Sequence, residues 1–239
     1  MKAERNPSLP LYQRVYETVL SRIIDGEWGP GAMLPSESDL GKQLGVSQGT
    51  ARKALMELEN RGIVQRKQGR GTFVATTTPE SALFHFFRLR REDGSQVMPR
   101  CETETVTRRA STPAERTVLG KGDGHVFEIA RVRSIDGKRI VREIAVVSAA
   151  LFPGLADRSP LPNTLYALYQ QSYGIVISSA DEDLRAVLAS DEDALLMDVK
   201  AGDPLIEVRR RAIDISDRCV EYRLSRYVTA DLNYSLHLS

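Results

Sequence analysis

The most constraining feature of this sequence is a pair of short helix-forming segments joined by a tight glycine turn. Ser36, with Asp39 three residues later, is a variant of the capping box that opens a helix. That helix is predicted to end at Gly45, and Ser47 can cap the next helix, which reaches about Arg61. Two helices with so short a connection form a helix-turn-helix.

The segments on either side complete a small domain. Residues 11–24 carry apolar side chains at helical spacing, and Pro10 suits the first turn of a helix there. After the third helix, residues 63–66 and 71–75 are β-prone and flank a basic, glycine-rich stretch. This pattern predicts a two-stranded hairpin, the wing of a winged helix.

The third helix has one apolar and one exposed face. Placed at 100° per residue, its apolar face is formed by Ala51, Ala54, Leu55 and Leu58. The opposite face carries Gly49, Lys53, Met56 and Asn60, with Arg52 on the flank. Small and basic residues near the helix start are typical of a recognition helix, whose first residues meet base edges in the major groove.

Charge is unevenly distributed along the 239 residues. The net charge of the whole chain is only +1, which by itself argues against a nucleic-acid-binding protein. Residues 42–75, however, hold seven bases and two acids, a net charge of +5. Such a segment attracts phosphate whatever the rest of the chain carries. A solvated helix face would show the same count, so charge alone leaves both interpretations open.

Beyond residue 75 the pattern changes from helices to strands. Residues 76–81 are polar and aperiodic and are interpreted as a linker, which divides the chain into domains at 1–75 and 82–239. Strands are predicted at 84–90, 100–107, 125–135, 139–148, 204–215 and 218–228.

Turns and helices punctuate these strands. Asp136 with Gly137, and Ser216 with Asp217, predict hairpins between neighbouring strands. Helices are predicted at 163–173 and after Ser190, where Asp193 completes a second capping-box variant. Strands that dominate, with a few helices between them, indicate an α+β domain.

These residues together resemble GntR-family bacterial transcription regulators. The winged-helix resemblance rests on residues 34–40, 44–47, 50–55, Leu58, Gly62 and 69–74. The rest of the chain is similar to the UTRA effector domain of the HutC-type branch, at 131–133, 136–137, Glu143, 152–155, 165–166, 173–174 and 219–222. The resemblance implies an α+β chain: an N-terminal winged helix-turn-helix, then an antiparallel-sheet, chorismate-lyase-like effector-binding domain.

The resemblance also implies the DNA contacts. Arg52 matches the family's base-reading arginine, while Gln48 stands where many members carry arginine. Because glutamine suits adenine and arginine suits guanine, we expect a shifted operator preference. The further predicted DNA-binding residues are Ser36, Ser47, Thr50, Lys53, Arg66, Gly69 and Arg70.

Two arginines mark the candidate effector site. Arg131 and Arg133 alternate along a predicted strand, so they point to one face. A carboxylate or phosphate would fit between them, because arginine binds both bidentately. Cross-strand pairing with Glu143 explains the same spacing. The resemblance adds Glu143, Glu221, Arg223 and Tyr227 to the effector-binding set, whereas residues 209–211 are expected to be solvated or at an interface.

No pattern indicates catalysis, and neither a cofactor nor a metal is expected. His85, His125 and His237 lie far apart without ligand spacing. Cys101 and Cys219 are interpreted as reduced thiols of a cytoplasmic protein, and no apolar stretch is long enough to span a membrane.

The resemblance implies a ligand-responsive regulator, a repressor, that binds pseudo-palindromic double-stranded operator DNA as a homodimer. Its effector is expected to be a small anionic metabolite bearing a carboxylate or phosphate. Two alternatives remain at this point: a DNA-binding protein whose C-terminal domain only dimerises, and a chorismate-lyase-like enzyme.

Overall fold

A computed structural model describes residues 9–76 and 88–236. The chain divides into two compact units, residues 1–76 and 77–239, and each is described by itself. The linker predicted at 76–81 lies outside the described residues except for Thr76, as does most of the strand predicted at 84–90.

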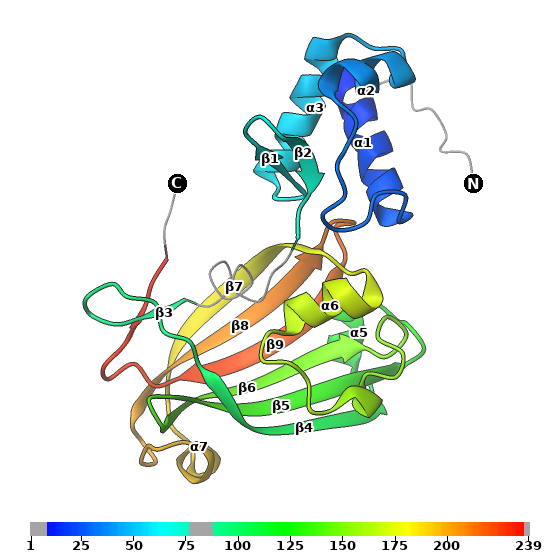
Figure 1. Cartoon of the computed structure of the whole chain (residues 1–239). Coiled ribbons are helices and arrows are strands. Elements are labelled where there is room, and N and C mark those ends of the chain that lie inside the picture. Colours follow the sequence, from blue (N-terminus) through cyan, green and yellow to red (C-terminus); the bar gives the residue numbers. More distant parts are fainter. Residues whose placement is uncertain (1–8, 77–87, 237–239) are drawn as a thin grey trace. The chain divides into compact units, whose positions relative to one another are not determined.

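The described part of the first unit, residues 9–76, contains three helices and a hairpin, which Figure 1 labels. Its elements are α1 (Leu11–Ile24), α2 (Glu37–Leu44), α3 (Gln48–Asn60), β1 (Val64–Lys67) and β2 (Gly71–Val74). The caps are those the sequence predicts, because the side chains of Ser36 and Ser47 accept the amides of Asp39 and Thr50. The apolar face predicted for α3 is the buried one.

The turn between α2 and α3 depends on two glycines. Gly45 ends α2 in the left-handed conformation, at φ 67°, which glycine adopts without strain. Gly41 is required for a different reason, since a Cβ there would lie 2.9 Å from the Val46 carbonyl oxygen. The turn therefore folds back closely against α2, and a side chain at position 41 would not fit there.

The second unit is built on a six-stranded antiparallel sheet with strand order β4-β5-β6-β9-β8-β7. Its strands are β4 (Arg100–Ala110), β5 (His125–Ile135), β6 (Lys138–Ser148), β7 (Ile177–Leu188), β8 (Pro204–Asp214) and β9 (Cys219–Tyr227). A separate two-stranded sheet pairs β3 (Leu89–Arg90) with β10 (Asn233–Tyr234).

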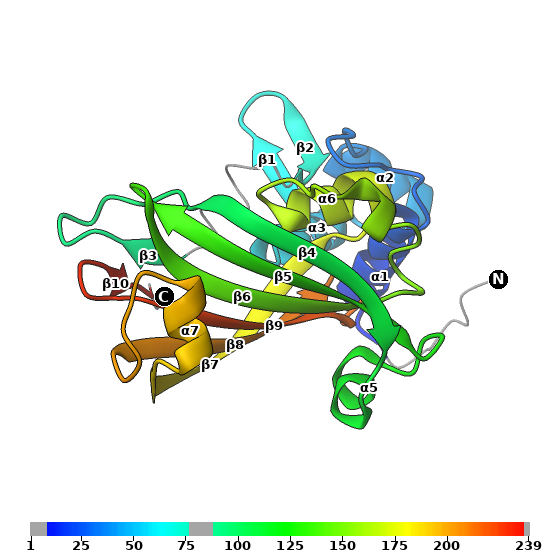
Figure 2. The same cartoon turned by 90° about the horizontal axis from the view of Figure 1, so that it is seen from below.

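Helices cover both faces of the large sheet. The helical elements are α5 (Pro113–Leu119), η1 (Ala156–Arg158), α6 (Leu165–Tyr173) and α7 (Asp191–Leu196). Figure 2 shows α6 on one face and α5 on the other. The main core lies under α6, where Tyr169 and Phe152 are fully buried against Ile129 and Val147. The predicted α+β architecture is confirmed.

Both predicted hairpin turns are present, but one strand of the large sheet, the two-residue strand β10 and one α-helix were missed. Asp136 and Gly137 have the positive φ angles of a tight hairpin, and β8 pairs antiparallel with β9. The missed strand of the large sheet is β7. It lies at the sheet edge, and its many polar residues leave it without a continuous apolar face. The missed helix, α5, does carry a signal, because Thr112 and Glu115 form a complete capping box.

Candidate DNA-binding surface and effector site

The start of α3 is fixed by its cap. The Ser47 Oγ accepts the Thr50 amide at 3.1 Å and lies 2.9 Å from the Thr50 Oγ1, so both predicted contact residues take part in the cap. Gln48 and Arg52, one turn apart, are exposed on the same side of the helix. The sequence thus places a glutamine and an arginine together near the start of α3, the end with which a recognition helix meets base edges.

The wing is held beside α2. The Leu34 amide donates to the Thr72 carbonyl oxygen at 2.8 Å, which fixes the segment before α2 to strand β2. The exposed tip of the hairpin turns through Gly69, at φ 69°. Lys67 and Arg70 are exposed beside it, so the tip combines positive charge with a backbone that can approach another molecule closely.

A groove of about 680 Å³ lies between the wing, the start of α2 and the start of α3. Its lining includes Ser36, Gln48, Arg66, Gly69 and Arg70, all of them predicted DNA-binding residues. Thr50, Arg52, Lys53 and Ser47 belong to the same α3 start but do not line the groove.

Arg66 has a structural role within this unit. Its Nη2 lies 3.0 Å from the Glu37 Oε1, and its Nε lies 3.3 Å from the Glu59 Oε2. Arg66 therefore ties β1 to α2 and α3, and its phosphate contact stays a prediction. The Lys53 Nζ lies 4.0 Å from the centre of the Tyr12 ring, a cation–π contact that leaves this exposed residue on the α3 surface.

In the second unit, Arg131 is buried under the segment that leads into α6. Its Nε donates to the Glu104 Oε2 at 2.7 Å, and its Nη2 donates to the Pro162 carbonyl oxygen at 3.1 Å. Its side chain has 0% exposure. Arg131 thus joins β4, β5 and the segment before α6, and its charge is balanced by Glu104.

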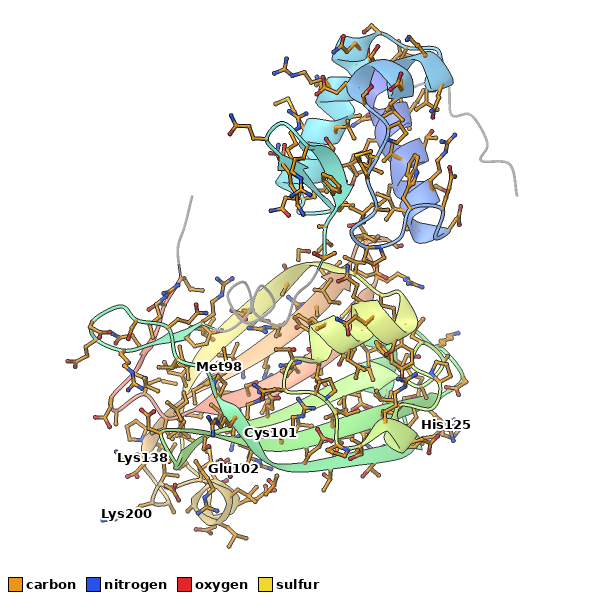
Figure 3. All side chains as sticks on the ribbon, in the orientation of Figure 1. Met98, Cys101, Glu102, His125, Lys138 and Lys200 are labelled. Carbon is orange, nitrogen blue, oxygen red and sulfur yellow. The ribbon has the colours of Figure 1, made fainter. Side chains whose placement is uncertain are left out.

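Arg133, two residues further along β5, makes a similar set of contacts. It donates from Nε to the Glu143 Oε1 at 2.9 Å and from Nη1 to the Asn163 Oδ1 at 2.9 Å. The cross-strand pairing that the spacing allowed is therefore present. Arg133 also pairs with Cys101 of β4 in register, so this part of the site lies toward the end of the sheet opposite His125 (Figure 3).

Glu143 connects Arg133 to a second cluster under α6. Its Oε2 lies 3.4 Å from the Arg223 Nη1, and the Arg223 Nη2 donates to the Glu221 Oε2 at 2.8 Å. Glu221, at 0% exposure, also accepts the hydroxyls of Tyr166 at 3.1 Å and Tyr169 at 2.7 Å. Five of the six predicted effector residues thus lie on one sheet face in two linked ion-pair clusters.

The sixth predicted effector residue, Tyr227, lies on the same sheet face but packs outside the two ion-pair clusters. Its ring meets Tyr234 edge-on at 5.5 Å, in an apolar cluster with Leu89 and Val141.

Arg210 corrects one expectation for residues 209–211. Arg209 and Arg211 are partly exposed, but the Arg210 side chain is only 6% exposed and is bound to Glu182. Arg210 can be buried because Glu182 on the edge strand β7 neutralises its charge. The sequence analysis did not predict this pair because it missed β7. Glu104, Asn163, Tyr166 and Tyr169 were also missed, although Tyr166 and Tyr169 have the spacing of neighbours on one helix face.

The cluster has a consequence for acid stability. Burial by itself raises the pKa of Glu143, but the charges of Arg133 and Arg223 outweigh it and hold this pKa at about 2, below the ordinary 4.5. The charged form therefore stabilises the fold above about pH 4.5, and this contribution is lost as the pH falls toward about 2.

We expect a Glu143→Gln variant to lose less stability than the wild type when the pH falls through this window. Urea unfolding of the full chain at about pH 6 and about pH 3 measures the difference. Glu192→Gln, at an exposed acid, is the control and should follow the wild type. Parallel losses in Glu143→Gln and wild type would contradict the assigned pKa shift.

Comparison with known proteins agrees with this arrangement. Residues 11–74 match the model described as "Bacterial regulatory proteins, gntR family", and residues 95–232 match the model of the UTRA domain. The chain belongs to the GntR family. This membership makes it a DNA-binding transcription regulator with a UTRA domain, and a regulator rather than an enzyme.

Several curated relatives of this GntR-family regulator are named as repressors. The histidine utilization repressor of Pseudomonas putida is 32% identical over 204 residues, which cover 84% of this chain and 82% of the relative. The transcriptional repressor NagR of Bacillus subtilis is 28% identical over 229 residues, 95% of this chain and 94% of the relative.

Solved structures give the same fold. PhnF from Mycobacterium smegmatis has a TM-score of 0.55 and 25% identity, and the match covers 94% of this chain and 99% of PhnF. The ligand-binding domain of a Bordetella bronchiseptica protein assigned to the GntR family has a TM-score of 0.57 and 30% identity, over 64% of this chain and 97% of that domain.

Two features are absent from the described residues. Within 9–76 and 88–236, no helix has both the length and the apolar character needed to cross a membrane. Over the same residues, no group of histidine, cysteine and acidic side chains is placed to hold a metal ion.

Proposed function

We propose that this GntR-family regulator is a repressor that binds a pseudo-palindromic operator as a homodimer. In this proposal each α3 enters the major groove of one half-site, and each wing tip contacts the adjacent minor groove. The observation that carries it is the shared groove of the first unit, where Gln48, the α2 start and the basic wing tip converge. The repressor assignment is supported by the names of the relatives.

We assign the DNA contacts by their places in this unit. Arg52 and Gln48 read bases, because both are exposed on the same side of α3 near its start. Four residues are assigned to the DNA backbone: Lys53, Ser36, Ser47 and Thr50. Their contacts with phosphate orient the protein on the duplex without specifying sequence. Gly69 and Arg70 act at the wing tip, and Arg66 acts mainly by holding the wing to Glu37 and Glu59.

The DNA part of the proposal is tested by selecting bound sequences from a library of random duplexes with the full chain. Two inverted half-sites should be enriched, because a two-fold dimer requires matching symmetry in its DNA. Light scattering of the free protein should give twice the mass of one chain. Enrichment of a single half-site, or a monomeric mass, would refute the dimeric operator complex.

We further propose that a small anion binds at the Arg131–Arg133 side of the sheet. Arg133 is the best candidate for direct contact, because its Nη1 donates to the uncharged side chain of Asn163, which is easier to displace than a carboxylate. Its Nη2 is shared between the Asn163 carbonyl oxygen and Glu143, so a bound anion would also compete with Glu143. The relatives do not identify the anion, since their names point to histidine utilization in one case and to mannosyl-D-glycerate in another.

One observation favours a second function for this unit. Arg131 and Arg133 are already compensated by Glu104 and Glu143, as they would be if the domain served only for dimerisation. Thermal shift with inorganic phosphate, sugar phosphates and aliphatic and aromatic carboxylates separates the two functions. An effector should raise the melting temperature of the wild type more than that of Arg133→Lys. Equal shifts in both proteins for every compound would favour the purely dimerising domain.

A further inference from the structure

The ion pairs of the candidate effector site continue across the sheet to the C-terminal strand. Arg210 on β8 hydrogen-bonds Tyr166, which itself donates to Glu221. The Arg210 Nε donates to the Glu182 Oε1 on β7 at 2.6 Å, and the Tyr234 hydroxyl on β10 donates to the Glu182 Oε2 at 2.8 Å. We call the whole set the Arg–Glu series: Arg133, Glu143, Arg223, Glu221, Tyr166, Arg210, Glu182 and Tyr234.

The series alternates in charge and is largely withdrawn from water. Its three arginines and three glutamates follow one another, and Tyr166 stands between Glu221 and Arg210. Side-chain exposure is 12% or less for all six charged members, and is 0% for Glu221. In such surroundings water does not compensate a broken pair, so each member depends on its neighbours for partners.

This dependence gives the series a way to respond to an anion. An anion that contacts Arg133 competes with Glu143 for the guanidinium, and a released Glu143 carboxylate moves toward Arg223. The attraction between Arg223 and Glu221 then weakens, because Arg223 is shared between two acids. The change passes from pair to pair because the charges alternate, whereas a single isolated ion pair would confine it.

The far end of the series lies where the chain enters the second unit. Tyr234 is paired with Leu89 of β3, and the Ser235 amide donates to the Arg88 carbonyl oxygen at 2.9 Å. Leu89 is fully buried, so this strand is anchored to the body of the unit. In sequence, β3 is the first described element of the second unit after the predicted linker, residues 76–81.

We propose that the Arg–Glu series couples the Arg133–Glu143 pair to the β3–β10 pair, and is thereby the route by which effector occupancy reaches β3, the first described strand after the predicted linker. Glu182 and Tyr234 are positioning residues in this account, since they act through Arg210 and β3. The regulatory meaning rests on the proposed function, but the coupling itself is a property of the unliganded chain.

Hydrogen exchange of the full chain without ligand or DNA tests the coupling. The readout is the exchange rate of a peptide covering residues 88–91, divided by that of a peptide covering residues 113–119 in α5 on the opposite face. Glu143→Gln should raise this ratio at least about fivefold, the lower end of typical coupling between sites. Dividing by the α5 rate removes any general loss of stability.

A double variant distinguishes transmission from local loosening. In a Tyr234→Phe background, Glu143→Gln should change the ratio by less than about twofold, because the link to Glu182 is already broken. Tyr222→Phe, on the other face of β9, is the matched control and should preserve the fivefold effect. The same fold-change with and without Tyr234→Phe, or no change in any background, overturns the proposal. Since neither DNA nor effector is present, failure of the proposed function leaves this result unaffected.

Discussion

Replacing Glu221 by alanine should lower the free energy of unfolding of the second unit by about 3–5 kcal/mol. Glu221 is fully buried and accepts hydrogen bonds from Tyr166, Tyr169 and Arg223. Its removal leaves the Arg223 charge with the longer ion-pair contact to Glu143, at 3.4 Å, and takes away the carboxylate that accepts the Tyr166 and Tyr169 hydroxyls. A buried charge without a close partner is among the largest single-residue penalties in folded proteins.

Urea unfolding of the full chain, followed by a probe in the second unit, measures this loss. Glu192→Ala is the matched control, because Glu192 is an exposed acid whose partner Arg142 keeps a second contact with Asp193. The control should lie within about 1 kcal/mol of the wild type, as surface ion pairs contribute little. A Glu221→Ala loss as small as that of the control would mean that Glu221 does not hold the cluster together.

Replacing Arg52 by alanine should weaken binding to the selected duplex by about 1–3 kcal/mol and relax the preference at one base pair of each half-site. Arg52 is exposed near the start of α3, beside Gln48, where a recognition helix meets base edges. Fluorescence anisotropy on the selected duplex, and on duplexes mutated at single positions, measures both effects.

The Lys53→Ala variant is the comparison that distinguishes a base contact from a phosphate contact. Lys53 follows Arg52 on α3 and carries the same charge, but as a phosphate contact it should lower affinity for every duplex equally and reduce the salt slope by about 1. If Arg52→Ala weakened random and selected duplexes by the same factor, Arg52 would be a phosphate contact instead of a base reader.

The first unit could be predicted from the sequence almost completely, because its signals are local. Ser36, Ser47 and Gly45 fix the helix ends within a few residues of themselves, and the structure places all three at those ends. The role of Gly41 could not be predicted, since it depends on the approach of the Val46 carbonyl oxygen from the following turn.

The second unit was predictable in most of its strands but not in most of its ion pairs. Parity along β5 puts Arg131 and Arg133 on one face and allows pairing with Glu143, but it cannot tell that Glu104 meets Arg131 from β4. Arg210 lies in a run of three arginines and was expected at the surface. Instead it is buried, and its charge is neutralised by Glu182, which lies 28 residues earlier on β7. Long-range pairing of this kind leaves no trace in local periodicity.

The two units also explain why the net charge of +1 is misleading. The +5 of residues 42–75 includes Arg66, whose charge is taken up by Glu37 and Glu59, while Lys67 and Arg70 stand exposed at the wing tip. In the second unit, arginines and glutamates cancel in buried pairs. The positive field available to DNA is therefore concentrated on the face formed by α3 and the wing.

Hydrogen exchange of the full chain with and without the selected duplex tests most directly whether this face binds DNA. We predict slower exchange in peptides covering residues 47–53 and 67–71, with Arg52→Ala reducing the protection at matched protein and duplex concentrations. Protection confined to the second unit, with unchanged exchange at the start of α3 and the wing tip, would contradict it.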